Sequence, residues 1–431
     1  LVDGTMQTYH DIQQHGGPPQ NPLVENDHPV IDWGLRHPNV LLLPSTDDVQ
    51  AAATMTTTQR RVVYVMKESN PQYCYWKVPH KVAKPLGWGW GVVEQAVVFH
   101  RVVRDTDPIM ILDADNDLYT FQMPTAAKAM YVAIKTLHKD RVDAELEQGC
   151  RENPYVEILR MQQMGDNIHV LQCIEALEDE RYLYIITPYC HEGDLWANIP
   201  WVFDYAPRAA PGYDEETAKQ LFIKILQILC YLEQHGICHH DLSPGNFMFL
   251  NGQLLLADFA MSFRFPKDPV TNQRWLTVPP TVPFGTKQYQ APDVYILHPY
   301  DGVHADLWSA AVLLYNLLTG HILYRMPLPT CLCFRYYLLA RALSRNPNPQ
   351  LVQQFQDDPN IQEMQAPLQL ISPQAMELLE HLLHVAPAQR WNLHQALNST
   401  WVVTNNNNDN NNVDVDVDVD VDVDVDVDVD V

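Results

Sequence analysis

The segment from Gly236 to Asn246, which reads GICHHDLSPGN, constrains this 431-residue chain more than any other part of its sequence. It holds an aspartate and an asparagine five positions apart, and Asp258 follows twelve residues after the asparagine. The carboxylate of Asp241 can accept a proton from a hydroxyl group, and the side-chain oxygens of Asn246 and Asp258 can bind Mg²⁺. Because phosphoryl transfer needs both functions close together, the segment predicts a site for this chemistry.

The same spacing resembles the catalytic and metal-binding loops of eukaryotic protein kinases, H-R-D-L-x-x-x-N followed by D-F-G. Further segments resemble kinase motifs in the family's order. They are Val132–Lys135 (VAIK), Gly285–Asp293 (GTKQYQAPD), the apolar helix expected over Asp306–Gly320, and Pro387–Trp391 (PAQRW). The chain is therefore identified as a member of the protein kinase family, of the Ser/Thr type, with a catalytic loop in which His240 replaces the usual arginine.

The resemblance implies an α+β, protein-kinase-like fold of two lobes, with a β-rich N-lobe and a mainly helical C-lobe. The kinase domain would span residues 79–402, divided into an N-lobe at 79–189 and a C-lobe at 190–402. Gly91 and Lys135 lie 44 residues apart, more than the family usually has. We therefore expect an acidic, irregular insertion at about 98–127. Residues 1–78, rich in Pro, Gln and Thr, would form a loosely ordered N-terminal extension.

Residues 403–431 form an Asn-rich and Val-Asp low-complexity tail. Its strict alternation is nominally a strand pattern, but nine like charges on one face would repel, so we expect disorder. The tail supplies ten of the aspartates behind a formal net charge of −25. This negative balance argues against nucleic acid and anionic membranes as partners.

Two further observations bear on where the protein works. No apolar run reaches the ~18–20 residues of a membrane helix, so we expect no membrane insertion. The eight cysteines are scattered without a zinc-binding spacing, and several lie in apolar runs. This pattern is typical of reduced thiols and predicts an intracellular, cytoplasmic protein.

The resemblance assigns catalytic roles to five residues. Asp241 would be the base, and Lys135 would reach the α- and β-phosphates of ATP. Glu157 would pair with Lys135, although Glu152 lies on the same candidate helix and is an open alternative. Asn246 and Asp258 would be the Mg²⁺ ligands.

The nucleotide would be bound by several segments. Leu86–Ala96 (LGWGWGVVEQA) resembles the glycine-rich loop shortened by one residue, although a simple turn between strands is the alternative. Adenine would be read by the Pro188 carbonyl and the Cys190 amide, and Asp194 would face the ribose. The full predicted set is Leu86, Gly87, Gly89, Gly91, Val93, Ala133, Lys135, Pro188, Cys190, Asp194 and Met248.

Several positions depart from the family pattern. His240 stands where many kinases have an arginine that binds an activation-loop phosphate, so we expect activity that does not depend on such phosphorylation. Ser243 replaces a lysine beside the γ-phosphate, and Ala260 replaces a flexible glycine. His239 would brace the loop through Asp306. The candidate phosphorylation sites are Thr271, Thr277 and Thr281.

The sequence thus predicts an ATP- and Mg²⁺-dependent kinase that phosphorylates Ser/Thr hydroxyl groups of protein substrates. One alternative is a catalytically weak pseudokinase that acts as a nucleotide-binding or scaffold module, favoured by the short glycine loop and Ser243. The other is a small-molecule kinase of related fold, which the sequences at 291–293 and 306–309 argue against. Substrate sequence, regulator and oligomeric state stay unknown.

Overall fold

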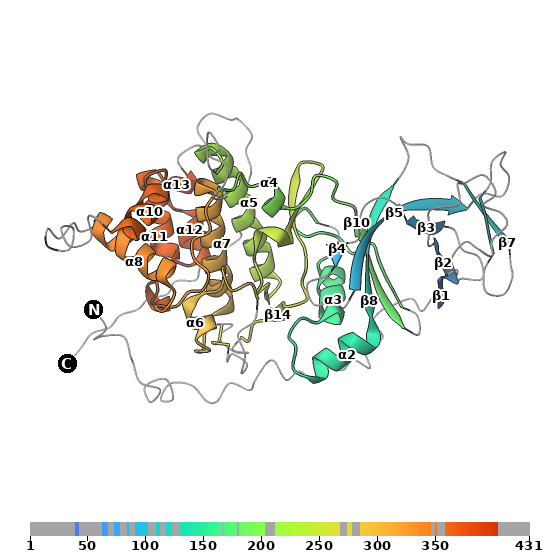
Figure 1. The fold of residues 1–431 in the computed structure, drawn as a ribbon. Helices are drawn as coiled ribbons and strands as arrows, with labels where there is room; N and C mark the ends of the chain where they lie inside the picture. The colour runs from blue at the N-terminus through green and yellow to red at the C-terminus, as the bar shows by residue number, and fades with distance from the viewer. Residues whose placement is uncertain are drawn as a thin grey trace, which may run out of the picture.

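The structure, a computed structural model, describes residues 39–42, 63–67, 73–77, 84–85, 91–101, 109–112, 118–122, 130–165, 167–178, 181–202, 212–267, 274–277, 285–345, 350 and 358–403. These residues form a sheet lobe and a helical lobe, which lie side by side in Figure 1. The predicted α+β arrangement with a β-rich N-lobe and a mainly helical C-lobe is confirmed. The predicted tail lies outside the described residues, apart from Val403.

The N-lobe is built on an antiparallel sheet with the strand order β1-β2-β3-β5-β8-β10-β9. In its central strand β8 (Tyr131–His138), successive side chains point to opposite faces. Val132 and Ile134 are buried in a cluster on one face, whereas Lys135 on the other face reaches toward helix α3 (Pro154–Met164). The other strands are β1 (Asn39–Leu42), β2 (Val63–Lys67), β3 (Tyr73–Lys77), β4 (Lys84–Pro85), β5 (Gly91–Arg101), β6 (Ile109–Leu112), β7 (Leu118–Gln122), β9 (Glu175–Glu178) and β10 (Tyr182–Pro188).

Two parts of this sheet differ from the sequence-based expectation. The N-terminal segment 1–78 contributes strands β1, β2 and β3, which extend the sheet beyond β5. The expected insertion holds β6 and β7, which pair with each other and with the end of β5. The strand sequences YCYWK and LYTFQ are rich in aromatic residues, which favour strands. The surrounding polar sequence hides this signal.

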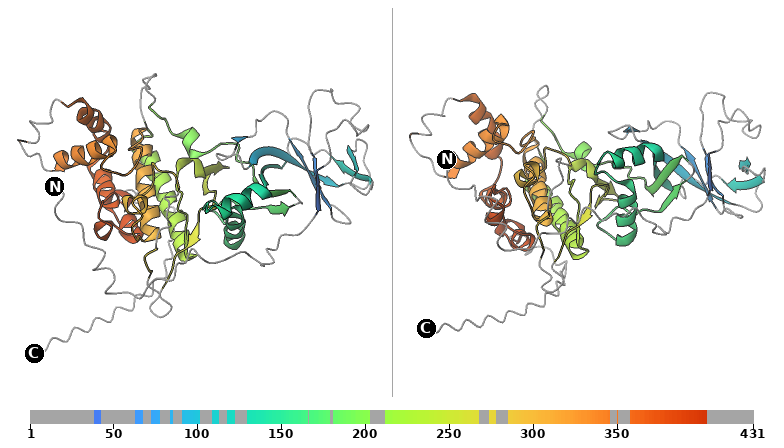
Figure 2. Two further views of the ribbon diagram at one scale, coloured as in Figure 1. Left: turned by 60° about the horizontal axis from the view of Figure 1, so that its bottom comes forward. Right: turned by 90° about the horizontal axis from the view of Figure 1, so that it is seen from below.

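Helix α3 begins and ends on clear local signals. The side chain of Asn153 accepts hydrogen bonds from the N–H groups of Tyr155 and Val156, and Pro154 occupies the first helical position. The helix ends at Gly165, whose φ is 62°. It follows the short helix α2 (Lys139–Glu147) and lies between the sheet and the C-lobe in both views of Figure 2.

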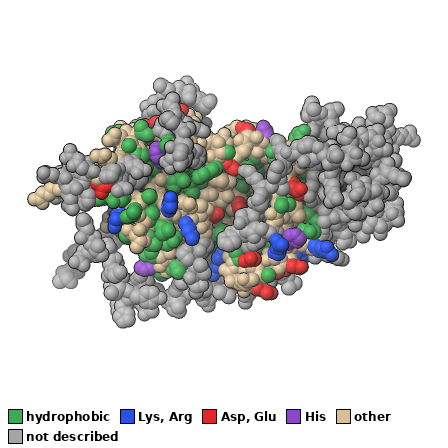
Figure 3. Space-filling model, viewed as in Figure 1, with side chains coloured by type: hydrophobic (Ala, Val, Ile, Leu, Met, Phe, Trp, Pro, Cys, Tyr) green, Lys and Arg blue, Asp and Glu red, His purple; other side chains and the backbone are tan. Residues whose placement is uncertain are grey.

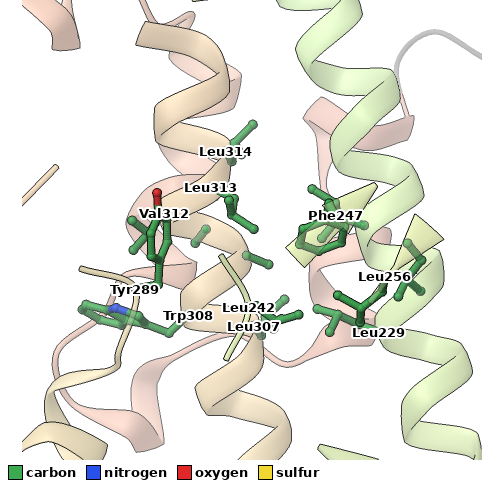
Figure 4. Packing of buried hydrophobic residues seen from close by; sticks show 14 of the residues in the cluster. Leu229, Leu242, Phe247, Leu256, Tyr289, Leu307, Trp308, Val312, Leu313 and Leu314 are labelled. Carbon is green, nitrogen blue, oxygen red and sulfur yellow. The ribbon is translucent and has the colours of Figure 1, made fainter. Parts of the chain in front are cut away.

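The C-lobe core forms around helices α5 (Glu215–Gln234) and α7 (Gly302–Thr319), which run side by side. Every residue of α7 except His304 is buried, as expected for a helix that is apolar nearly all round. Figure 4 shows Phe247 and Leu256 packed close to α5, and Leu242 near α7. The catalytic loop therefore rests on a well-buried apolar core.

Shorter elements complete the C-lobe. Two small two-stranded antiparallel sheets lie beside the catalytic loop: β11 (Ile237–Cys238) pairs with β14 (Phe263–Arg264), and β12 (Phe247–Leu250) pairs with β13 (Gln253–Leu256). The remaining helices are α4 (Leu195–Asn198), α6 (Pro292–Tyr295), α8 (Leu332–Arg345), α10 (Pro359–Leu368), α11 (Pro373–Leu382), α12 (Leu393–Leu397) and α13 (Thr400–Val403), with 3₁₀ turns at Pro244–Asn246 and Pro387–Gln389.

The surface of the described part is mixed. On the face seen in Figure 3, hydrophobic side chains gather over the helical lobe, and Lys and Arg side chains lie among them. In the part of the chain that the structure covers, no helix combines the length and apolar character needed to span a membrane.

Candidate active site

A buried carboxylate of α7 binds the main chain of the catalytic loop. The two side-chain oxygens of Asp306 accept the backbone N–H groups of His239 at 2.7 Å and His240 at 2.8 Å. Burial raises the pKa of Asp306 to about 7, although the two N–H groups work in the opposite direction. The expected brace between His239 and Asp306 is therefore made by the main chain and not by the imidazole ring.

The imidazole of His239 has a different task. Its Nδ1 accepts the N–H of Asp241 at 3.3 Å, and its Nε2 lies 3.1 Å from the carbonyl oxygen of Ala257. These two contacts fit a neutral ring with its hydrogen on Nε2. Burial lowers the pKa of His239, which keeps the ring in this neutral form. His239 thus links the catalytic loop to the residue that precedes Asp258.

The carboxylate of Asp241 is oriented from two sides. Its Oδ1 accepts the backbone N–H of Thr286 at 2.6 Å, and its Oδ2 lies 3.3 Å from Nδ2 of Asn246. The same Nδ2 donates to the backbone oxygen of Asp241 at 2.8 Å. Because the asparagine nitrogen faces Asp241, its side-chain oxygen is left to bind other groups. The structure thus brings the predicted base and one predicted metal ligand into contact.

Lys135 forms the ion pair expected of it. Its Nζ lies 2.7 Å from Oε2 of Glu157 on α3 and 3.9 Å from Oδ1 of Asp258. Glu157 is only 4% exposed. Burial opposes the charge on Lys135, but the carboxylates of Asp258 and Glu157 raise its pKa above the ordinary value. The partner left open between Glu152 and Glu157 is therefore Glu157.

Glu152, the alternative partner, nevertheless borders the same site, but it lies before α3 and not on the helix as expected. It precedes the helix cap Asn153, whose N–H donates to the carbonyl oxygen of Ala260 at 2.8 Å. Burial and the nearby charge of Asp258 raise the pKa of Glu152 to about 6. The loop before α3 therefore packs on the segment after Asp258, a contact between residues more than a hundred positions apart.

Asp258 begins this segment in an unusual backbone conformation. Its φ is 63°, in the left-handed region that non-glycine residues seldom adopt. The following Phe259 is fully buried, and its ring meets that of His239 edge-on at 4.8 Å between centroids. With Phe259 anchored inside, the side chain of Asp258 stays 40% exposed and faces Lys135. The carboxylate of Asp258 thus faces Lys135 from a strained backbone position.

The donor set suits a magnesium ion shared with a phosphorylated substrate. Asp258 offers a carboxylate near Lys135, and Asn246 offers an amide oxygen next to Asp241. No group of three His, Cys, Asp or Glu side chains that could hold a metal occurs among the described residues. Mg²⁺ is commonly bound by one or two protein oxygens together with substrate phosphates, so the residues present fit this ion.

The predicted nucleotide residues of the sheet are described only in part. Leu86, Gly87 and Gly89 lie outside the described residues. At Gly91, a Cβ atom would come 1.8 Å from the carbonyl oxygen of Thr136. Glycine is therefore required there by the close approach of β5 to β8, a packing reason that the motif alone does not reveal.

The next two predicted positions sit in the middle of the sheet. Val93 is paired with Lys135 across β5 and β8, and Ala133 is paired with Thr187 across β8 and β10. Ala133 and Lys135 lie two residues apart in β8 and therefore share one face.

Two of the predicted nucleotide residues, Cys190 and Met248, lie together. Cys190 and Met248 belong to one apolar cluster with Leu171 and Leu255. Pro188 is the last residue of β10, and its carbonyl oxygen lies 3.8 Å from the thiol sulfur of Cys190.

Asp194 follows Pro188 and Cys190 in the chain and caps the short helix α4. Its Oδ1 accepts the N–H of Ala197 at 2.7 Å and so caps α4. Its backbone also forms an isolated bridge with that of Met248. The Asp194 side chain, which was predicted to face the ribose, is therefore already held in place by the first turn of α4.

The place where many kinases would bind an activation-loop phosphate is filled by rings. His240 is buried, and its ring lies 5.0 Å from that of Phe263 and 5.2 Å from that of Tyr300. Burial lowers the pKa of His240 to about 3. Thr277 is fully buried and exchanges both backbone hydrogen bonds with Tyr300. The other two candidate phosphorylation sites, Thr271 and Thr281, lie outside the described residues.

Two of the kinase-like motifs, which lie almost a hundred residues apart, are joined by a buried ion pair. Asp293 Oδ1 and Arg390 Nη2 lie 2.9 Å apart, and both side chains are almost completely buried. The guanidinium also lies 4.9 Å from the ring centroid of Trp308. The segments Gly285–Asp293 and Pro387–Trp391 are thus held together by a charge-assisted contact.

Comparisons with known proteins agree with this geometry. The family model described as the protein kinase domain matches residues 120–402. CDPK-related kinase 1 from Arabidopsis thaliana is 27% identical over 280 residues, which cover 64% of this chain and 42% of the relative. Calcium-dependent protein kinase 24 from the same plant is 30% identical over 276 residues, 63% of this chain and 40% of the relative.

A third relative comes from an animal. Serine/threonine-protein kinase kin-29 of Caenorhabditis briggsae is 32% identical over 158 residues, 36% of this chain and 17% of the relative. In each case the matched region spans less than half the length of the relative.

Proposed function

The chain belongs to the protein kinase family, and on this premise we propose that it is an ATP- and Mg²⁺-dependent kinase that phosphorylates Ser/Thr hydroxyl groups of protein substrates. One observation carries the proposal. The oriented carboxylate of Asp241, the ion pair of Lys135 with Glu157, and the exposed carboxylate of Asp258 meet at the junction of the two lobes. Phosphoryl transfer depends on positioned charges of this kind.

In this proposal the nucleotide lies between the sheet and the catalytic loop. Pro188 and Cys190 would bind adenine above Met248, and Asp194 would face the ribose. Lys135 would balance the negative charge of the phosphates, and its contact with Glu157 fixes the direction of its long side chain. The predicted glycine-rich loop would cover the phosphates from the other side.

Asn246 and Asp258 would hold Mg²⁺, which when bound supplies positive charge against the phosphates. Asp241 would orient the substrate hydroxyl and accept its proton. The bonds from Thr286 and Asn246 hold its carboxylate in one orientation, so little reorganisation is needed when the substrate arrives.

Protein substrates and an intracellular location complete the proposal. Thr286 stands where Ser/Thr-specific kinases have a threonine, which supports acceptors of that type. Cys150, Cys173, Cys190, Cys230 and Cys238 are free thiols, as is usual in a reducing compartment.

The decisive experiment compares phosphate transfer to a generic protein substrate by the wild type and by Asp241→Asn. We expect kcat to fall by roughly 10²–10⁴-fold, because the base is removed. Nucleotide affinity should stay close to that of the wild type, because Asp241 makes no contact with the nucleotide in this proposal. Asp140→Asn on the exposed first turn of α2 makes the same chemical change away from the site and should leave kcat unchanged. A wild type no faster than Asp241→Asn would mean that the chain is a pseudokinase.

A further inference from the structure

The activation segment must be held in place for the proposed site to work. It runs from Asp258 to Thr286, and the N–H of Thr286 orients Asp241. A Cβ atom on the preceding Gly285 would lie 2.6 Å from the carbonyl oxygen of His240, so the end of the segment rests directly on the catalytic loop. Any displacement of the segment would therefore disturb Asp241.

One side chain in the middle of this segment makes two ion pairs. Arg274 Nε lies 3.0 Å from Oδ2 of Asp301, and its Nη1 pairs with Oε1 of Glu233. The guanidinium also lies over the ring of Phe265, 5.9 Å from its centroid. About three quarters of the Arg274 side chain is withdrawn from solvent, which strengthens pairing over what an exposed pair would give.

Arg274 is itself fixed by the main chain of the segment. It forms an isolated antiparallel bridge with Lys267, and the N–H of the next residue, Trp275, donates to the carbonyl oxygen of Pro266 at 2.9 Å. Two residues later, Thr277 bonds to Tyr300 in both directions. These backbone hydrogen bonds therefore fix the position from which the Arg274 side chain extends.

The two carboxylates belong to the elements that carry the catalytic loop. Glu233 lies in the last turn of α5, which leads into β11 and then into His239. Asp301 caps α7, and its Oδ1 accepts the N–H groups of Val303 and His304. Five residues after Asp301, Asp306 holds the loop from α7. Arg274 therefore connects the activation segment to α5 and α7, the two helices that support the catalytic loop.

We propose that Arg274 is a positioning residue for the reaction: its two ion pairs hold the activation segment so that the N–H of Thr286 meets Asp241. The segment is then held by the positive charge of Arg274, and it needs no added phosphate. This inference rests on the proposed kinase function. Two observations agree with it, since Thr277 is fully buried and the His240 ring is enclosed by Phe263 and Tyr300.

The anchoring cation is permanent. Burial opposes the charge of Arg274, but Asp301 and Glu233 raise its pKa further above the ordinary arginine value. Without the guanidinium, these two carboxylates would face each other across a partly buried space. Their repulsion would then act between α5 and α7, and the segment would lose both of the ion pairs that hold it to these helices.

The first test compares Arg274→Gln with Arg274→Lys. Arg274→Gln should lower kcat by about ten- to a hundredfold, as expected for a misplaced catalytic group. The KM for ATP should change little, because the nucleotide residues lie elsewhere. Arg274→Lys keeps the charge and should recover part of the loss. The matched control is Lys267→Gln, which removes a cation over the same Phe265 ring, 5.2 Å from its centroid, and should leave kcat unchanged.

A charge swap sharpens this test. Arg274→Glu and Glu233→Arg should each reduce kcat, and the double variant should recover more activity than either single variant. Wild-type kcat in Arg274→Gln, or a parallel loss of kcat, nucleotide binding and thermal stability, would overturn the proposal.

A second measurement does not require activity. Hydrogen exchange at the amides of Thr277 and Thr286 should become faster in Arg274→Gln and stay unchanged in Lys267→Gln. Unchanged exchange in Arg274→Gln would refute the anchoring role even in an active enzyme. An inactive wild type would refute the kinase function, and the exchange experiment would still decide whether Arg274 holds the segment.

Discussion

His240 illustrates how one residue can sit in the active site and yet take no part in its charge balance. Its ring is enclosed by Phe263 and Tyr300, and burial lowers its pKa to about 3. The histidine is therefore neutral at any pH at which the protein is expected to work. A neutral ring cannot attract a phosphate, which agrees with the expectation of phosphorylation-independent activity.

This burial has a consequence for stability. Unfolded, His240 binds a proton below pH ~6.5, whereas the folded protein leaves it neutral down to about pH 3. Unfolding therefore takes up a proton between these values, and stability falls as the pH drops through this window. For this one residue we expect a loss of roughly 2 kcal/mol between pH 7 and pH 5.

Urea unfolding at the two pH values measures this loss. Asn tolerates the φ of 70° at this position, so His240→Asn is a control without a titrating ring. The variant should be less stable at both pH values but should show a smaller decrease between them. Equal decreases in the two proteins would contradict the assignment.

At the scale of residues, motifs predict much of the site, because they fix chemistry by spacing along the chain. Asp241, Asn246, Lys135 and Glu157 are all predictable in this way, and the structure brings them together in two contacting pairs. Contacts between distant segments are not predictable from spacing. Nothing in the sequence near His240 indicates that Tyr300 packs on its ring.

At the scale of elements, the end of α7 shows how tightly the C-lobe is assembled. Gly320 follows the helix with a φ of 64°, and a Cβ atom there would lie 2.4 Å from the carbonyl oxygen of Pro200. The glycine is thus required by its backbone conformation and by a neighbouring chain segment.

Two glycine substitutions separate these causes. Gly252 has a similar φ of 74°, but a Cβ atom placed on it would meet no other atom within 4 Å. Gly252→Ala should lower the free energy of unfolding by about 1 kcal/mol, from backbone strain alone. Gly320→Ala should lower it by roughly 3 kcal/mol, because steric overlap with Pro200 is added. Denaturant unfolding of both variants checks the difference, and equal losses would show that Pro200 yields without cost.

Elements are predictable where their pattern is strong. The apolar run of α7 and its stop at Gly320 occur as the sequence predicts. The short strands β1, β6 and β7 are not predictable, because each has five residues or fewer and lies in polar surroundings. Strands of this length are stabilised by their neighbours in the sheet more than by their own sequence.

At the scale of the whole molecule, the two lobes share the proposed nucleotide site, so ligand binding should stabilise their assembly. Mg²⁺-ATP at a hundred times its Kd should add about 2.7 kcal/mol to the free energy of unfolding and raise Tm by several degrees. Differential scanning fluorimetry with ATP, with and without Mg²⁺, measures this effect.

Asp258→Asn should remove most of the Mg²⁺-dependent part of the shift, because it deletes the only charge among the two predicted metal ligands. Asp140→Asn should keep the full shift. If saturating Mg²⁺-ATP leaves the Tm of the wild type unchanged, both the kinase and the nucleotide-binding pseudokinase are excluded.

The fastening of the catalytic loop also bears on how such a protein can change over evolutionary time. Asp306 grips the main chain of His239 and His240, so these two bonds do not depend on which side chain occupies position 240. Any residue that accepts a left-handed backbone at position 240 leaves both hydrogen bonds to Asp306 intact. Position 240 can therefore gain or lose a phosphate-binding arginine by a single substitution during evolution, while the backbone of the catalytic loop keeps its shape.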